Sequence, residues 1–143
     1  RSTLFPYTTL FRSPYSKQVI GPIDLDTVMP GYYFSDIGDL IRSMAGTVDE
    51  NSTCWEDIAI RKDFYEALIK GYLEGIGDTF TKEECDNIHQ SGLMMIFMQC
   101  LRFVTDFLNN DVYYITTYPE QNLNRALNQL LLLERLEEFL AEK

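Results

Sequence analysis

The stretch Val19–Arg42, VIGPIDLDTVMPGYYFSDIGDLIR, decides the fold of this chain. It opens with a short apolar run that ends at Ile23, and two carboxylates follow at once, Asp24 and Asp26. Side chains two positions apart in a strand point to the same face. We therefore expect a short strand with both carboxylates on one side of its end.

Two carboxylates on one face suggest a bound cation. Like charges held side by side repel each other, and a divalent cation is the usual reason for tolerating that repulsion. Carboxylate ligands suit a hard ion such as Mg2+. An Asp at a strand end is also common as a solvated turn residue, so the spacing of Asp24 and Asp26 leaves both interpretations open.

A helix is predicted to follow this strand. Pro30-Gly31 reads as a turn, and Ser35 can cap a helix that runs to about Ala45. Asp36 lies in the first turn of that helix, where the helix dipole favours an acid. The apolar stripe of the helix is formed by Ile37, Leu40, Ile41 and Met44.

The rest of the chain is also mainly helical by pattern. Apolar residues recur at helical spacing in three further segments, which are Ile60–Ile76, Lys82–Leu108 and Asn122–Glu142. Thr81 and Glu84 form a capping box at the start of the second of these. Val112–Tyr118 is β-branched and aromatic, which favours a short extended segment. The sequence therefore predicts a helical bundle with a short β element at its start.

Two pairs of opposite charge lie at helical spacing. Asp39 and Arg42 are three residues apart, and Arg102 and Asp106 are four residues apart. Pairs at these spacings commonly form ion pairs on a helix surface. On spacing alone, both pairs are expected to be of this kind.

Two blocks of the sequence resemble a known kinase family. The blocks are IDLDTVMPGYYFSDIGDLIRS at Ile23–Ser43 and LRFVTDFLNNDVYY at Leu101–Tyr114. Both resemble the aminoglycoside phosphotransferase-like small-molecule kinases and are most similar to the N-acetylhexosamine 1-kinases. The resemblance implies part of the C-terminal lobe of a protein-kinase-like fold. It also implies transfer of a phosphoryl group from ATP to the anomeric hydroxyl of a sugar.

The resemblance implies a role for each acid of the first block. Asp24 would hold Mg2+ against the nucleotide phosphates, and Asp26 would support that ion or hold a second one. Asp36 would brace the catalytic loop. Asp39 lies on a helix that would border the sugar pocket, which makes it a candidate substrate-binding residue.

The second block would supply the sugar contacts. By the same resemblance, Arg102 would hold sugar oxygens with its planar set of donors. Tyr113 would stack on the sugar ring or hydrogen-bond to it, with Tyr114 as the less favoured substitute. The turn Asn109–Asp111 would deliver these tyrosines at the end of the helix.

The first 13 residues, RSTLFPYTTLFRS, resemble a translated sequencing adapter and are expected to be an artefact outside the fold. Residues 14–143 would then form the C-terminal part of the kinase lobe. In the resembled enzymes the catalytic loop lies roughly twenty residues before the metal-binding element. Here that position falls inside the adapter-like string, so we expect the catalytic Asp to be absent from this chain.

Composition limits the partners. The formal net charge is −10, and a surface this acidic argues against binding to nucleic acid or to an anionic membrane. We expect no apolar run long enough to span a bilayer. Three cysteines without metal-ligand spacing are typical of free thiols in the cytoplasm. A small-molecule sugar is the expected partner, and no protein partner is implied.

Two other functions remain open. A kinase of the same superfamily that acts on an aminoglycoside, choline or another sugar would share Asp24 and Asp36, but not the block from Arg102 to Tyr113. From a different class, the chain could be a non-catalytic, acidic helical interaction module.

The missing catalytic loop gives a first prediction. Loss of the general base alone costs on the order of a hundredfold to ten-thousandfold in rate. We expect this polypeptide, mixed with ATP, Mg2+ and N-acetylglucosamine, to form no sugar 1-phosphate above background in a coupled assay. Product formation at enzyme-like rates would contradict that expectation.

Overall fold

The computed structural model describes residues 2–4, 10–12, 19–22 and 29–142. The described part of the chain is mainly helical, as the sequence predicts. Its α-helices are α1 (Tyr33–Met44), α2 (Lys62–Ile76), α3 (Lys82–Asp86), α4 (Ile88–Leu108) and α5 (Gln121–Ala141). Short 3-10 turns lie at Trp55–Asp57 and Gly77–Thr79.

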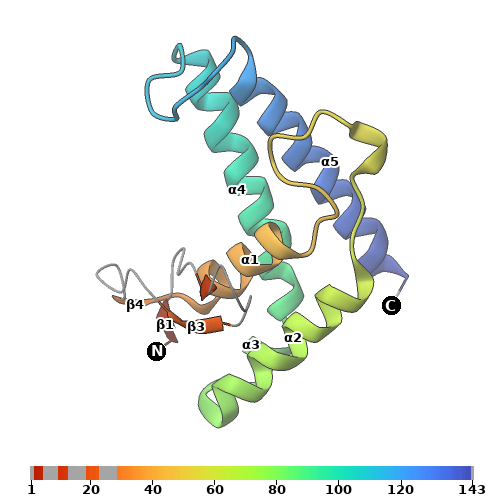
Figure 1. Ribbon diagram of the computed structural model, residues 1–143. Helices are drawn as coiled ribbons and strands as arrows, with labels where there is room; N and C mark the ends of the chain where they lie inside the picture. The colour runs from red at the N-terminus through yellow and green to blue at the C-terminus, as the bar shows by residue number, and fades with distance from the viewer. Residues whose placement is uncertain (1, 5–9, 13–18, 23–28, 143) are drawn as a thin grey trace.

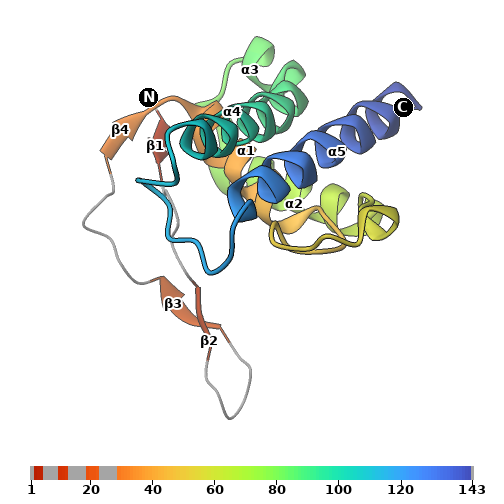
Figure 2. The same ribbon diagram turned by 90° about the horizontal axis from the view of Figure 1, so that it is seen from above.

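In the described segments ahead of the helices lie the strands β1 (Ser2–Leu4), β2 (Leu10–Arg12), β3 (Val19–Pro22) and β4 (Met29–Gly31). They form two separate antiparallel pairs, β1 with β4 and β2 with β3 (Figures 1 and 2). The expected strand before Asp24 is therefore present as β3. Strand pairs this short do not form a sheet with its own core. They do not test the origin of residues 1–13, which stays a prediction.

The expected turn at Pro30-Gly31 is wrong. Both residues belong to β4, in which Pro30 lies opposite Thr3 and Gly31 opposite Ser2. A proline lacks the N–H that a central strand needs, but it is tolerated in an edge strand. Each strand of a two-stranded sheet is an edge strand, so β4 can hold Pro30.

The helices form a bundle around α4. Figures 1 and 2 show α4 and α5 running side by side and α1 crossing α4. The buried apolar side chains between them make one cluster, which comprises Ile37, Ile41, Ala45, Ile58, Tyr65, Ile69, Ile88, Ile96, Leu132, Leu136 and Phe139. The apolar stripe predicted for the first helix supplies Ile37 and Ile41, both fully buried.

The start of α1 differs from the sequence prediction. The residue before the helix is Tyr32, and no side chain caps it; Ser35 lies inside the first turn. Aromatic packing accompanies this earlier start, because Tyr32 stacks on Phe34 and the Tyr33 ring meets the edge of Phe80 with centroids 5.0 Å apart. Ring contacts of this kind stabilise a chain beyond their buried area.

The long helix expected over Lys82–Leu108 is broken in two. The capping box is confirmed, with Thr81 accepting from the Glu84 backbone and the Glu84 carboxylate accepting from Thr81. The helix it starts ends after one turn, however, at Asn87, whose backbone leaves the helical region with φ −101° and ψ 7°. The Asn87 side-chain amide donates to the carbonyl of Glu83 at 2.8 Å, beside the backbone bond from Asn87 N to the same oxygen, and α4 begins at Ile88.

Helix α4 also bears on the predicted absence of a membrane span. Within the described residues, it alone is long and apolar enough to cross a bilayer. This differs from the sequence prediction that no run reaches that length. The core helix of a bundle passes the same test, so α4 is weak support for a membrane, and the absence of a membrane partner stays a prediction.

Two glycines permit the close crossing of α1 and α4. A Cβ on Gly38 would meet the backbone carbonyl of Ser91 and, at 2.5 Å, the side chain of Met95. A Cβ on Gly92 would lie 2.8 Å from a methyl group of Ile41. These contacts are shorter than packed carbon atoms tolerate, so only glycine fits at either position.

The crossing yields a stability prediction. Gly38→Ala should lower the free energy of unfolding by about 1–3 kcal/mol, because the added methyl forces the helices apart. Gly71→Ala in α2 is the matched control, because nothing lies within 4 Å of its added Cβ; alanine there should stabilise the protein by up to about 1 kcal/mol. Urea unfolding curves of the wild type and the two variants test this. Equal midpoints for Gly38→Ala and Gly71→Ala would contradict the close contact of α1 with α4 at Gly38.

Candidate functional site

The predicted metal ligands, Asp24 and Asp26, lie outside the described residues. Their proposed role in holding Mg2+ therefore stays a prediction. Within the part of the chain that the structure describes, no three His, Cys, Asp or Glu side chains gather as a possible metal site. The donor set itself, two carboxylates, suits a hard cation such as Mg2+.

Asp36 is buried in the first turn of α1, with 7% of its surface exposed. Its carboxylate accepts a hydrogen bond from the hydroxyl of Tyr72 on α2, at 3.3 Å. Burial raises the pKa of Tyr72, and the Asp36 charge and this hydrogen bond raise it further. Asp36 thus ties α1 to α2; its proposed contact with a catalytic loop stays a prediction.

Asp39 forms the ion pair that its spacing predicts, but the pair is not a surface one. Its carboxylate lies 2.8 Å from Nε of Arg42, whose side chain is only 7% exposed. The same guanidinium binds Glu50 in the loop after α1, at 2.9 Å. Asp39 is therefore already engaged in an ion-pair chain, and a sugar would have to share it.

Arg102 lies at the exposed surface of α4 and faces two tyrosines. Its guanidinium carbon is 5.8 Å from the ring centroid of Tyr113 and 5.7 Å from that of Tyr114. Both distances lie within the range of cation–π attraction. The structure thus brings together two of the three residues that the resemblance assigns to the sugar, Arg102 and Tyr113, while Asp39 pairs with Arg42 on α1.

The two tyrosines differ in their freedom. Tyr114 is half-buried; its ring packs on Phe103, and its hydroxyl accepts from the Gln99 amide at 3.2 Å. Tyr113 is 71% exposed. The Tyr113 ring is therefore the more accessible one for a ligand. It packs edge to face against the Tyr114 ring, with ring centroids 4.8 Å apart.

The ion pair expected between Arg102 and Asp106 is wrong. Asp106 is buried, with 5% exposed, and its two oxygens accept from the backbone amides of Tyr113 and Tyr114, each at 2.9 Å. Its Oδ2 also accepts from the side chain of Asn122 at 2.9 Å. A helical charge pair predicted by spacing has instead become a buried anchor for the next loop.

That loop, residues 109–120, contains no strand, so the extended segment expected at Val112–Tyr118 is also wrong. The predicted turn at Asn109–Asp111 is present, with Asn110 and Asp111 in left-handed conformation at φ 65° and 56°. Asn and Asp tolerate this conformation better than most residues. The Asp111 side chain accepts a second hydrogen bond from Asn122.

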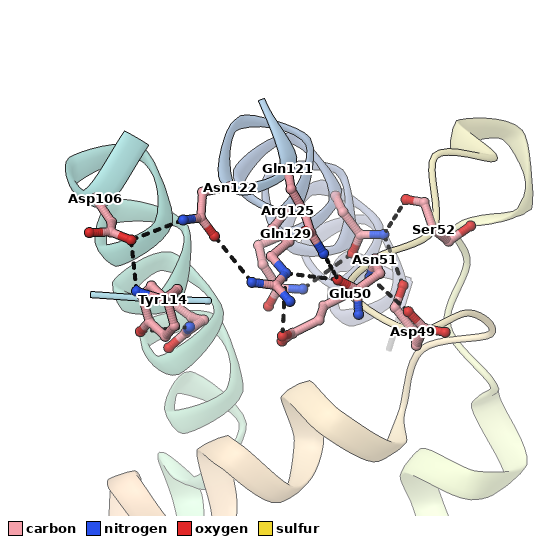
Figure 3. A network of polar contacts seen from close by, with 12 residues as sticks. Asp49, Glu50, Asn51, Ser52, Asp106, Tyr114, Gln121, Asn122, Arg125 and Gln129 are labelled. Carbon is pink, nitrogen blue, oxygen red and sulfur yellow. Dashed lines mark hydrogen bonds and ion pairs between the residues drawn. The ribbon is translucent and has the colours of Figure 1, made fainter. Parts of the chain in front are cut away.

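Figure 3 shows how Asn122 continues into a wider polar network. Asn122 accepts from Arg125 at 3.2 Å, and Arg125 donates to Asn51 at 2.8 Å and lies 4.0 Å from Glu50. Glu50 in turn binds Arg42, the partner of Asp39. A continuous chain of polar contacts thus runs from Asp106 on α4 to Asp39 on α1.

Sequence reasoning missed Asp106 and Glu50 as members of this network, while the family resemblance indicates a structural role for Asn122 and Arg125. Asp106 and Glu50 look ordinary alone, as a helix-surface acid and a loop acid. The one available signal was the pattern of Asp106 followed by three consecutive Asn and Asp residues and two tyrosines, which indicates a polar helix end.

The lone histidine has a structural partner. The hydroxyl of Tyr65 lies 2.7 Å from Nδ1 of His89, and the two rings stack. Burial raises the pKa of Tyr65 to about 12, so this hydroxyl stays protonated and is no nucleophile at neutral pH. His89 therefore belongs to the helix packing.

A hollow of about 650 Å3 lies elsewhere on the bundle. It is open to solvent and is lined mainly by apolar side chains from α1, α4 and α5, among them Tyr33, Phe34, Met94 and Phe97. Of the predicted site residues that the structure describes, Asp36, Asp39, Arg102 and Tyr113, none lines it. The three cysteines are free thiols, as expected.

A search against protein-family models finds none that matches this chain. The kinase resemblance of the two sequence blocks therefore enters below as a proposal.

The buried tyrosine yields a pH prediction. Folding raises the pKa of Tyr65 from 10.0 to about 12, so its contribution to stability is complete below pH 10 and is lost as the pH rises towards 12. The loss should reach about 2–3 kcal/mol. Urea midpoints should fall less steeply over this range in Tyr65→Phe than in the wild type. The control Tyr118→Phe, at a half-exposed ring, should follow the wild-type curve.

Proposed function

We propose that this chain is the C-terminal part of an ATP-dependent small-molecule kinase of the aminoglycoside phosphotransferase-like family. The complete enzyme would phosphorylate the anomeric hydroxyl of an N-acetylhexosamine. One observation carries the proposal: an exposed guanidinium, Arg102, stands beside an exposed aromatic ring, Tyr113, at the end of α4. This pairing is also the one that the second resembling block implies for the sugar site.

The pair suits a carbohydrate on chemical grounds. The guanidinium offers several N–H donors in a fixed plane, which can bind adjacent sugar oxygens. The aromatic ring offers an apolar face to the C–H surface of a pyranose. Within the described residues, no hydrogen bond or ion pair engages the Arg102 guanidinium, so its donors are available to a ligand.

The remaining roles follow the first sequence block. Asp24 holds Mg2+ in this proposal and Asp26 supports it; the bound ion would neutralise charge on the nucleotide phosphates. Asp36 braces the catalytic loop from the start of α1. Asp39 contacts the sugar from α1.

A second candidate function has its own supporting observation. Helix α4 exposes a row of apolar side chains, Met94, Phe97, Met98 and Leu101, each 37–49% exposed. Exposed apolar surface of this kind is typical of interaction sites. An acidic helical interaction module would use that surface and would bind no hexosamine, which separates the two candidates.

Sugar binding tests the proposal directly. Titration of the 15N-labelled protein with N-acetylglucosamine should shift the backbone amides of Tyr113 and Tyr114 and the Nε–H of Arg102 in a saturable way. Arg102→Lys should weaken binding about 10- to 100-fold, because lysine keeps the charge but loses the planar set of donors, and one lost hydrogen bond to a charged group costs about 1.5–3 kcal/mol.

The matched control is Arg135→Lys, since Arg135 is a surface arginine on α5 that pairs with Glu138. It should bind the sugar as the wild type does. Saturable shifts with choline or an aminoglycoside, but not with the hexosamine, would redirect the proposal to another kinase of the superfamily. Absence of any shift at Tyr113 with all of these ligands would contradict it.

A further inference from the structure

The loop that carries Tyr113 has little apolar packing to hold it. Val112 and Ile115, on either side of the two tyrosines, are 80% and 88% exposed, and Leu108 at the end of α4 is also exposed. The Tyr114 ring packs on Phe103, but a loop with few buried apolar contacts is ordinarily among the least stable parts of a protein. Polar contacts must therefore fix the ring of Tyr113 beside Arg102.

Asp106 supplies those contacts at some expense to local stability. It lies in the last turn of α4, where the helix dipole disfavours a negative charge. It is buried, and within the described residues no cation lies in ion-pair contact with it. A buried carboxylate is tolerated when it is fully hydrogen-bonded, and here three N–H groups donate to it.

The two carboxylate oxygens of Asp106 accept different hydrogen bonds. Oδ1 accepts from the Tyr113 amide, while Oδ2 accepts from the Tyr114 amide and from Asn122. Two consecutive backbone amides held by one carboxylate fix the direction in which both side chains leave the chain. Asn122, which is fully buried, holds the carboxylate from the start of α5.

The same bonds determine what Arg102 faces. Arg102 and Asp106 are one helical turn apart and could pair, but the Asp106 oxygens are taken up by backbone amides. The guanidinium lies against the two tyrosine rings instead. Asp106 therefore both places the rings and leaves the Arg102 donors unengaged.

We infer that Asp106, held by Asn122, is a positioning residue for a hexosamine-binding pair formed by Arg102 and Tyr113. The inference rests on the proposed function for its ligand. The arrangement of carboxylate, amides and rings stands independently of it. Asp106 itself touches no ligand; it acts through the loop that it fixes.

Amide hydrogen exchange in the wild-type protein tests the arrangement first. The amides of Tyr113 and Tyr114 should exchange at least tenfold more slowly than those of Val112 and Ile115, which donate no hydrogen bond within the described structure. Equal rates at all four positions would overturn the inference without any variant being made.

Asp106→Asn then tests the positioning role. Its amide group would face one of the two backbone N–H groups, so protection of Tyr113 and Tyr114 should fall at least tenfold. The ring-current shift of the Arg102 Nε–H should diminish, and N-acetylglucosamine should bind at least tenfold more weakly. Asp63→Asn is the control, because Asp63 is an exposed acid in the first turn of α2, away from the loop after α4; it should retain protection and affinity.

The outcomes separate the inference from the proposed function. If Asp106→Asn loses protection but binds the sugar as tightly as the wild type, the positioning role is overturned. If the wild type binds no hexosamine, the proposed function fails and the ligand part of the inference fails with it. The amide exchange rates of the wild type test the hydrogen bonds to Asp106 whatever the binding result. They do so even if Asp106→Asn does not fold.

Discussion

The close crossing of α1 and α4 is the contact on which the rest of the bundle depends. Gly38 and Gly92 bring the two helices together without intervening side chains, and Ile41 fills the space beside Gly92. Packing at this density tolerates little change in volume. The crossing sets the position of Asp36 and Asp39 relative to the Ser91–Met95 part of α4.

Polar contacts also connect α1 to α5 and to the end of α4. Arg42 joins α1 to the loop after it through Glu50, and Arg125 joins that loop to α5. Arg125 then reaches Asn122, the partner of Asp106. Buried networks of this kind specify one arrangement because a partly satisfied network is costly. The bundle therefore holds the loop after α4 and the acidic face of α1 in a defined relation.

The proposed sugar site lies at the edge of the bundle, where local sequence preferences are broken. A buried acid ends a helix at Asp106, two consecutive residues adopt left-handed conformation at Asn110 and Asp111, and a tyrosine ring is left exposed at Tyr113. Departures from local rules tend to concentrate at functional sites. This supports the choice of the α4 end as the site over the larger, apolar hollow between α1, α4 and α5.

The sequence by itself determined the helical class, the capping box at Thr81 and helices α2 and α5 to within two residues, because these depend on periodicity and on neighbours along the chain. It also singled out Arg102 and Tyr113. Tertiary structure decided the early start of α1 and the partners of Asp106. The first accompanies ring packing between α1 and Phe80, and the second depends on backbone amides across a turn and on Asn122 of α5, which helical spacing does not encode.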